Sequence, residues 1–194
     1  MDNQIGVDIA HRGAISPWVE RFISLAPSGR VLDLACGQGR HTAWLLAQGA
    51  DVLALDRNHD VLPPLKALGA DVLLHDLEPT PESASWPFEE NLFSAIIVCH
   101  YLHRPLFPYL LSSLTPDGIL IYETFAMGNA EYGKPSNPHF LLQPGELFQQ
   151  TTSNSSVRMQ VIAYEDGFVR VPKPAMVQRI CARKAAQSSE KDVL

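Results

Sequence analysis

The chain has 194 residues, of which 46% are hydrophobic, and this size suits one globular domain with a full core. Its formal net charge of -6 argues against a broad nucleic-acid surface, because phosphate contacts need clustered lysine and arginine. The three cysteines are far apart and form no Cys-x-x-Cys pair, which disfavours a disulfide framework or a thiolate zinc site and fits a reducing cytoplasm.

The amino terminus carries no basic stretch followed by an apolar run, and the chain has no stretch of about 18 apolar residues. We therefore expect a cytoplasmic protein that does not associate with membranes. We expect one domain over residues 1–183 and a polar tail over residues 184–194.

A helix is predicted from Pro17 to about Ala26, with Ser16 as its N-cap and proline at the first helical position. Apolar runs then predict buried strands, and helical patterns alternate with them. The predicted strands are 30–35, 51–56, 71–75, 94–99 and 118–124, and the predicted helices are 40–48, 60–68 and 104–114. This alternation predicts an α/β fold, a single doubly wound Rossmann-like domain with a mostly parallel sheet.

The pattern changes near the carboxyl terminus. Two strand-like runs, 157–164 and 176–183, are separated by Asp166-Gly167 and Pro172-Lys173-Pro174, with no room for a full helix. A hairpin is the natural interpretation, so one of these two strands must be antiparallel to the rest of the sheet.

A glycine turn between the first strand and the next helix is the most informative feature of the chain. Residues 31–46 form an apolar strand, a turn that contains Gly37 and Gly39, and an apolar helical pattern. Such a turn brings backbone N–H groups against a nucleotide-like ligand at the carboxyl end of a parallel sheet. A side chain at either glycine would obstruct that approach.

Two residues distinguish this turn from a dinucleotide-binding motif. The third small position of G-x-G-x-x-G/A is occupied by Thr42. Asp33 lies just before the turn, where its charge would repel a pyrophosphate but attract a ligand with a sulfonium and an ammonium group. The pattern therefore favours S-adenosylmethionine. Alternatively, Asp33 is a structural acid that accepts hydrogen bonds from the glycine turn.

At Val31 to Gly39 the chain resembles the first motif of the class I S-adenosylmethionine-dependent methyltransferases, and further matches follow in order over about residues 14–183. The resemblance implies a seven-stranded sheet with an antiparallel C-terminal strand. Arg40-His41, His103 to Phe107 and Asn137 to Leu147 resemble the branch of tellurite-resistance-type and other small-molecule methyltransferases.

Acidic residues at the ends of successive strands are the predicted cofactor contacts. Asp56 follows Gly37 by 19 residues and can accept both ribose hydroxyls, although it could instead cap the helix that starts near Asp60. Asp76 can accept from the adenine amino group while Leu77 packs near the ring, as the family resemblance implies, or it could be a solvated loop residue.

Other cofactor contacts are expected beside these acids. The backbone carbonyl of Cys99 is expected to accept from the methionine ammonium, and Ala35 and Arg57 are expected to contact the cofactor as well. His41 lies in the first turn of the helix and contacts the ligand or packs in the core.

Residues after the fourth strand are the candidates for chemistry. His100 and Tyr101 are expected to line the reaction pocket. Tyr101 and His103 could contact the substrate or relay a proton, and Arg104 could clamp an anion, although each could instead be a packing residue. No carboxylate or thiolate stands near His100 and His103, so no metal site is expected.

The turn-rich segment 125–143 contains aromatic residues, among them Tyr132, and is the expected substrate lid. Residues 122–124, with Glu123 as a substrate contact, would form the floor of the pocket. The N-terminal stretch 10–13 is expected to close the other side.

The leading prediction is a methyltransferase that acts on a small, partly apolar or soft nucleophile by in-line displacement, as a monomer or homodimer. After the fourth strand, enzymes that resemble nucleic-acid amino-methyltransferases have [Asn/Asp]-Pro-Pro-[Tyr/Phe], whereas this chain has Cys99-His100-Tyr101-Leu102. Cytosine C5 enzymes have a Pro-Cys nucleophile, whereas no proline precedes Cys99 here. The alternatives are a tRNA or rRNA methyltransferase, a non-catalytic S-adenosylmethionine-binding protein and an NAD-dependent oxidoreductase.

Overall fold

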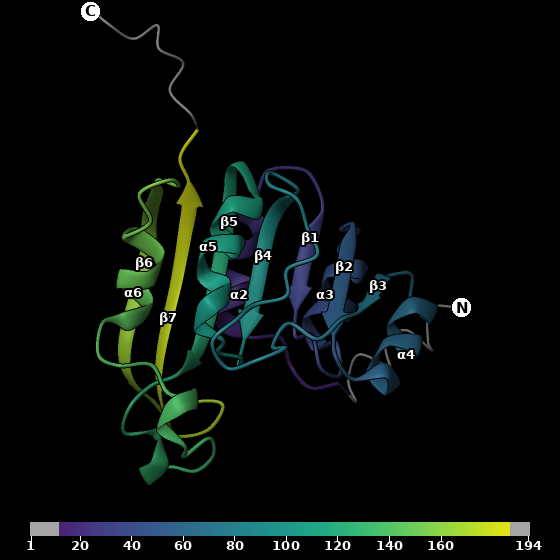
Figure 1. Ribbon diagram of the computed structural model, residues 1–194. Helices are drawn as coiled ribbons and strands as arrows, with labels where there is room; N and C mark the ends of the chain where they lie inside the picture. Colours follow the sequence, from purple (N-terminus) through teal and green to yellow (C-terminus); the bar gives the residue numbers. More distant parts are fainter. Residues whose placement is uncertain (1–11, 187–194) are drawn as a thin grey trace, which may run out of the picture.

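The computed structural model describes residues 12–186, which form one seven-stranded sheet with helices on both faces (Figure 1). The strand order is β3-β2-β1-β4-β5-β7-β6. The strands are β1 (Val31–Leu34), β2 (Val52–Asp56), β3 (Asp71–Leu74), β4 (Phe93–Cys99), β5 (Leu114–Phe125), β6 (Met159–Val169) and β7 (Ala175–Lys184).

Strands β1 to β5 pair in parallel, whereas β7 pairs antiparallel with both β5 and β6. Within the described residues, β7 is therefore the one strand that opposes the others. The predicted fold class is confirmed, including the antiparallel C-terminal strand.

One short helix precedes β1, and others lie in the connections between the strands. The α-helices are α2 (Pro17–Phe22), α3 (Arg40–Ala47), α4 (Leu62–Ala67), α5 (Phe107–Ser113) and α6 (Glu146–Thr152). Single turns of 3₁₀ helix are η1 (Ile23–Leu25), η2 (His59–Val61), η3 (Arg104–Leu106), η4 (Asn129–Glu131) and η5 (Pro138–Phe140). Ser16 caps α2 as predicted, since its Oγ accepts from the backbone N–H of Trp18 at 3.1 Å.

The alternation of side chains along the strands divides the core between the two faces of the sheet. Leu32 and Leu34 of β1 pack in a cluster that includes side chains of α5 and α6, whereas Val31 packs with α2 and α3. Figure 1 shows α5 and α6 in front of the sheet and α2 and α3 behind it. A residue on the Val31 side at the end of a strand therefore faces α3, which decides the position of Asp33.

The structure departs from the predicted elements near the carboxyl terminus. Helix α6 was not predicted, and β6 continues through Asp166-Gly167, where a turn was expected. Gly167 pairs with Val177 of β7, so the hairpin turn lies in residues 170–174 instead. Lys184, predicted as the first residue of the tail, ends β7 and is buried; residues 187–194 lie outside the described part of the chain.

The ammonium of Lys184 links the end of β7 to the end of α5 and the start of β5 by hydrogen bonds. Its Nζ donates to Asn91 Oδ1 at 2.9 Å, to the Ser112 carbonyl at 2.8 Å and to the Leu114 carbonyl at 2.7 Å. Burial lowers the pKa of this lysine, and these three acceptors stabilise its charged form.

We predict that Lys184→Met lowers the free energy of unfolding by about 2 kcal/mol, because buried carbonyls lose a charged donor while the apolar stem of the side chain is kept. Urea denaturation measures the change. Lys66→Met, at an exposed position of α4, is the control and should change stability by less than about 0.5 kcal/mol. Equal effects of the two variants would contradict a special role for Lys184.

Candidate functional site

Two adjoining cavities open at the carboxyl end of the sheet, where β1 and β4 lie side by side. The larger one, called here the main cavity, has a volume of about 430 Å³, and the glycine-side cavity has a volume of about 270 Å³. Ala35 and His100, which follow β1 and β4, line both. The crossovers leave in opposite directions from these two strands, and ligands of open α/β sheets bind at such a switch point.

Ala35 and His100 also share a backbone strain that marks this edge. Their φ angles are +52° and +57°, a region that residues other than glycine rarely adopt. Strain of this kind is stored where the surrounding structure must hold a ligand-facing loop in one conformation. Both residues therefore stand at the centre of the candidate site.

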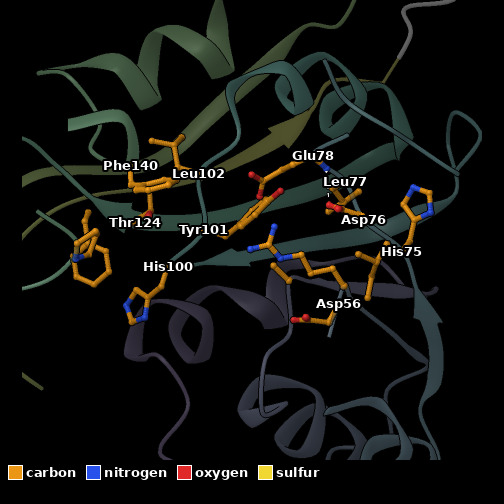
Figure 2. Close-up of a pocket in the computed structure, with 15 residues that line it drawn as sticks. Asp56, His75, Asp76, Leu77, Glu78, His100, Tyr101, Leu102, Thr124 and Phe140 are labelled. Atoms are coloured by element: carbon orange, nitrogen blue, oxygen red, sulfur yellow. Dashed lines mark hydrogen bonds between the residues drawn. The ribbon is translucent and has the colours of Figure 1, made fainter. Parts of the chain in front are cut away.

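Figure 2 shows the main cavity with two distinct ends. Asp56, His75 and Asp76 lie at one end, and Thr124, Phe140 and His100 lie at the other, with Tyr101 and Glu78 between them. The cavity thus extends from the ends of β2 and β3 to the ends of β4 and β5. Its remaining lining residues are Ala35, Leu55, Arg57, Leu77, Leu102, Phe125 and Pro135.

Asp56 holds the glycine turn and faces the main cavity at the same time. Its Oδ2 accepts from the Gly37 N–H at 2.8 Å, and its Oδ1 accepts from the Asn58 N–H at 2.9 Å. A carboxylate has about four acceptor positions, so two remain for a ligand. The residue that caps the following 3₁₀ turn is Asn58, not Asp56, so the alternative role as an N-cap is wrong.

Asp76 and Leu77 lie where the sequence placed them, in the loop after β3. Both line the main cavity; Leu77 is buried, and Asp76 accepts from the Glu78 N–H at 3.0 Å. An exposed carboxylate beside a buried leucine is suited to a flat ring that carries an exocyclic donor.

The two positions of the turn require glycine for different physical reasons. A Cβ at Gly39 would come within 2.9 Å of three carbon atoms of Leu65, so that glycine permits α3 and α4 to pack. A Cβ at Gly37 would meet nothing within 4 Å and would project into open space. Gly37 lines the glycine-side cavity, so its missing side chain leaves room for a ligand.

Asp33 is almost fully buried and supports the first turn of α3 from β1. Its Oδ2 accepts from the backbone N–H of Thr42 at 3.0 Å and from the Thr42 hydroxyl at 2.6 Å. The N-cap residue Gly39 has no side chain with which to cap the helix, so the carboxylate of Asp33 takes that role. Asp33 also lines the glycine-side cavity, so the structural and the ligand-facing interpretations are compatible.

His41 packs against Asp33 in the same buried region. Its Nδ1 lies 3.8 Å from Asp33 Oδ1, and its Nε2 accepts from the Ser16 N–H at 3.4 Å. Burial raises the pKa of Asp33 to about 7, with Thr42 opposing that shift, and burial lowers the pKa of His41 to about 3. His41 is therefore an uncharged ring that lines the glycine-side cavity.

The ring of His100 lies open to the cavities and stacks on Phe125, with centroids 4.8 Å apart and planes 28° apart. Its backbone N–H donates to the Glu123 carbonyl at 2.9 Å. The surrounding protein lowers the pKa of His100, and the nearby cation of Arg40 lowers it further, while Glu123 opposes them. An uncharged imidazole at the junction of two cavities can accept a proton.

Tyr101 directs a buried hydroxyl toward the middle of the main cavity (Figure 2). Within the described residues that oxygen makes no hydrogen bond of good geometry. Burial raises the pKa of Tyr101, and the nearby charge of Glu78 raises it further. The carbonyl of Tyr101 accepts from the Tyr122 hydroxyl at 2.8 Å, which fixes the backbone at this point. An orphaned buried hydroxyl is suited to a ligand partner.

Four predicted reaction residues do not line either cavity, because each is engaged elsewhere. His103 is buried, and its Nε2 lies 2.8 Å from the Ser83 carbonyl. Glu123 is buried on the α3 face, 3.7 Å from Arg179, its partner across β5 and β7. Tyr132 is 45% exposed and packs on Phe168 of β6.

Arg104 is the fourth predicted reaction residue that lines neither cavity, and its guanidinium binds the lid segment and helix α6. Its guanidinium donates from Nε to Glu146 Oε1 at 2.6 Å and from Nη2 to Glu146 Oε2 at 2.9 Å. It also donates to the carbonyls of His139 and Leu141 at 2.8 and 3.0 Å. With its donors so engaged, Arg104 is not placed to clamp an anion in the main cavity.

The predicted lid, residues 125–143, covers one end of the main cavity. It contains η4 and η5 and returns to the sheet where Ala126 pairs with Leu142. Pro135 and Phe140 line the cavity. Gln178 of β7 fastens the base, since its Nε2 donates to the Gln143 carbonyl at 2.6 Å and its Oε1 accepts from the Leu147 N–H at 2.9 Å.

Of the N-terminal stretch predicted to close the pocket, Ala10 and His11 lie outside the described residues. Arg12 lines the glycine-side cavity and donates to the Gln38 carbonyl at 2.6 Å. Cys99 lines the same cavity, as predicted for a residue at the end of β4.

Sequence reasoning missed several lining residues. His75 and Glu78 flank the predicted Asp76-Leu77 pair, and their position after β3 was the available signal. Phe140 and Pro135 belong to the predicted lid, but nothing in the sequence distinguishes them from its exposed aromatics. Within residues 12–186, no group of three or more His, Cys, Asp or Glu is placed to hold a metal ion, and no helix is long and apolar enough to cross a membrane.

Residues 31–118 match a family model described as a methyltransferase domain. No curated protein sequence matches the chain. Among solved structures, TehB from Haemophilus influenzae has a TM-score of 0.66 at 18% identity, over 86% of this chain and 61% of TehB. S-adenosylmethionine-dependent methyltransferases from Methanosarcina mazei and Mesorhizobium loti have TM-scores of 0.66 and 0.63 at 13% and 18% identity; the matches cover 90% and 84% of this chain and 100% and 96% of theirs.

At these identities the solved structures show a shared fold. The domain match covers a little less than half of the chain, and it contains the glycine turn, Asp56, Asp76 and the end of β4. Residues 31–118 therefore resemble a methyltransferase domain, and the chain shares its fold with structures of S-adenosylmethionine-dependent methyltransferases.

We predict opposite consequences for alanine at the two glycines. Gly39→Ala should lower the free energy of unfolding by about 2 kcal/mol or more, because it adds left-handed strain and a clash with Leu65. Gly37→Ala should cost about 1 kcal/mol of strain but weaken binding of S-adenosylhomocysteine at least about tenfold. Thermal unfolding and calorimetry measure the two effects; a reversed order of the two variants in both assays would contradict this assignment.

A second prediction concerns pH. The raised pKa of Asp33 means that the folded state keeps a proton between about pH 4 and 7 that the unfolded state has released, so stability falls as pH rises through that window. The lowered pKa of His41 has the opposite sign, and stability rises from about pH 3 to 6.5.

Removing one group should therefore expose the slope of the other. Between pH 4.5 and 6.5, His41→Gln should lose stability with rising pH, and Asp33→Asn should gain it, each by about 1 kcal/mol or more relative to the wild type. Urea denaturation at the two pH values measures both slopes. Parallel pH profiles for the wild type and both variants would show that neither group titrates in this range.

Proposed function

We propose that the protein transfers a methyl group from S-adenosylmethionine to a small-molecule nucleophile bound under the lid. The observation that carries this proposal is the apolar end of the main cavity, enclosed by Phe125, Pro135 and Phe140 beside His100. That end is continuous with the part of the cavity that contains Asp56 and Asp76. An acceptor there would lie next to a bound cofactor and against apolar side chains.

The residues present fit the cofactor in parts that correspond to its chemical groups. We assign the ribose to Asp56 with Arg57 beside it, and the adenine to Asp76 and Leu77. The glycine-side cavity then takes the methionine portion. Asp33 and the Cys99 carbonyl would face its ammonium there, and Gly37 and Ala35 would leave room for its chain. The sulfonium of the bound cofactor supplies an activated methyl group, so no further activation of the donor is needed.

The chain's own groups then orient the acceptor and manage its proton. His100 lines both cavities and so lies where the assigned adenosine and methionine regions meet. Its uncharged imidazole is placed to accept a proton from the acceptor, while the lid excludes water. In-line approach of the acceptor to the methyl carbon depends mainly on such positioning.

The distribution of arginines supports a small molecule over an RNA. An RNA methyltransferase would need a basic rim, for which the sequence offers Arg12, Arg57, Arg104 and Lys134. Of these, Arg104 is engaged by Glu146 and two lid carbonyls. Arg12 and Arg57 border the proposed cofactor region, and the formal net charge is -6. The resemblance of His103 to Phe107 and of Asn137 to Leu147 to the branch of tellurite-resistance-type and other small-molecule methyltransferases supports the same choice of a small acceptor.

Binding of S-adenosylmethionine, S-adenosylhomocysteine and NAD, measured by calorimetry, tests the cofactor assignment. Methyl incorporation into bulk tRNA and rRNA and into a panel of thiols, phenols, amines and tellurite tests the acceptor. We expect no steep loss of affinity for tRNA with rising salt, since each neutralised phosphate would add about 0.7 to 0.9 to the logarithmic slope. Robust methylation of RNA with no turnover on the panel would establish the RNA alternative.

For Asp56, we predict that Asp56→Asn weakens S-adenosylhomocysteine binding at least tenfold. Each charge-assisted hydrogen bond to a ribose hydroxyl is worth about 1.5 to 3 kcal/mol, and the amide keeps only one acceptor oxygen. Because the carboxylate also accepts from Gly37, thermal unfolding must show that the variant stays folded. Asp60→Asn, at an exposed residue of η2 outside both cavities, is the control; equal dissociation constants for the two variants would contradict the ribose assignment.

A further inference from the structure

The part of the main cavity that would receive the acceptor has a distinctive composition. It lies at the ends of β4 and β5 and is lined by Leu102, Thr124, Phe125, Pro135 and Phe140, together with the ring of His100. Figure 2 shows Phe140, Leu102 and Thr124 grouped there, with His100 on the sheet side. This group of six is called here the acceptor pocket.

Flat rings form two of its walls. The imidazole of His100 and the ring of Phe125 are stacked within 28° of parallel and form one surface. Phe140 is 51% exposed although it lines the cavity, so the protein itself covers only part of its ring. Aromatic faces prefer offset or edge contacts with other rings, and each such contact adds to the burial of apolar area.

The acceptor pocket contains no cationic side chain among its six residues. Lys134 precedes Pro135 but is exposed and does not line the cavity, and Arg40, whose charge lowers the pKa of His100, lines the glycine-side cavity. Arg104 donates to Glu146 and to the carbonyls of His139 and Leu141. Arg57 lines the other end of the cavity, after β2, which is separated from β5 by β1 and β4. Toward the middle of the cavity, the charge of Glu78 raises the pKa of Tyr101 and the charge of Arg57 lowers it, so both signs of charge act there.

We propose that the acceptor is an uncharged aromatic nucleophile, a thiol, hydroxyl or amine on a planar ring, that lies between Phe140 and the His100–Phe125 stack. This inference rests on the proposed function and narrows its substrate class. An uncharged ring is favoured over an oxyanion because none of the six residues of the acceptor pocket offers an anion a cationic partner.

For a thiol or hydroxyl acceptor, the lone pair on sulfur or oxygen forms a bond to the methyl carbon. The carbon–sulfur bond of the donor breaks, and its electron pair stays on the donor sulfur, which becomes neutral. The proton of the acceptor passes to the imidazole of His100 and then to water. A ring held against His100 brings the acceptor atom near the proton acceptor.

Binding of methylated products separates ring recognition from nucleophile reactivity. Thioanisole, cyclohexyl methyl sulfide and 4-(methylthio)benzoate share the methylated sulfur and differ in aromaticity or charge. With the protein saturated with S-adenosylhomocysteine, we expect thioanisole to bind at least about fivefold more tightly than either of the others in calorimetric titrations. Tightest binding of the cyclohexyl compound or of the benzoate, or binding of none of the three, would overturn the proposal.

Variants connect that preference to the pocket. Phe140→Ala should reduce thioanisole affinity at least about fivefold and leave the dissociation constant of S-adenosylhomocysteine unchanged, since Phe140 lies at the opposite end from Asp56. Phe148→Ala, at a 44% exposed aromatic of α6 outside the lining, is the matched control. If the two variants bind thioanisole equally well, Phe140 does not recognise the ring.

The test also separates this inference from the function on which it rests. Turnover of tellurite but not of thiophenol, measured as release of S-adenosylhomocysteine, would overturn the aromatic acceptor and leave small-molecule methyl transfer intact. Failure to bind S-adenosylmethionine at all would instead remove the proposed function.

Discussion

The buried carboxylate of Asp33 is the interaction on which the site depends. It comes from strand β1, which lies between β2 and β4, caps helix α3 through Thr42, and lines the glycine-side cavity. A second carboxylate, Asp56, holds the intervening turn from the other side through the Gly37 N–H. The glycine turn is therefore fixed by two acids from neighbouring strands, and its shape is set before any ligand arrives.

The alternation of strand side chains explains why the two halves of the site differ. Residues on the Val31 side of the strands face α2 and α3, and this side contains Asp33 and Glu123 near the strand ends. On the opposite side, the apolar cluster of α5 and α6 continues toward Leu77 and Leu102, which line the main cavity. The different linings of the glycine-side cavity and the main cavity thus follow from the two faces of one pleated sheet.

Much of the architecture could be predicted because the strands are short apolar runs and because turn residues separate them. The pattern failed where tertiary contacts override local signals. Asp166-Gly167 indicates a turn, but pairing with Gln178 and Val177 keeps both residues in β6. Helix α6 has no side-chain cap at Gly145. It is stabilised by the ion pair between Glu146 in its first turn and Arg104, and these two residues are 42 positions apart in the sequence.

The candidate site shows the same limit at the level of single residues. Positions that follow a strand directly, such as Asp56 and Asp76, could be predicted, because parallel strands end at one edge. His103 could not be separated from His100 by residue type. The backbone turns at His100, where φ is +57°, and the chain then directs His103 toward the carbonyl of Ser83.

The location of Arg104 has the largest consequence for substrate class. In the sequence, Arg104 follows the fourth strand and was a candidate clamp for an anion. In the structure its guanidinium donates hydrogen bonds to Glu146 and to the carbonyls of His139 and Leu141, which flank the cavity residue Phe140. The same guanidinium that could have paired with an anion instead holds an aromatic ring over the acceptor pocket. A guanidinium whose donors are engaged by the lid segment is not available to a ligand of the cavity, and this is one premise of the aromatic acceptor that we propose.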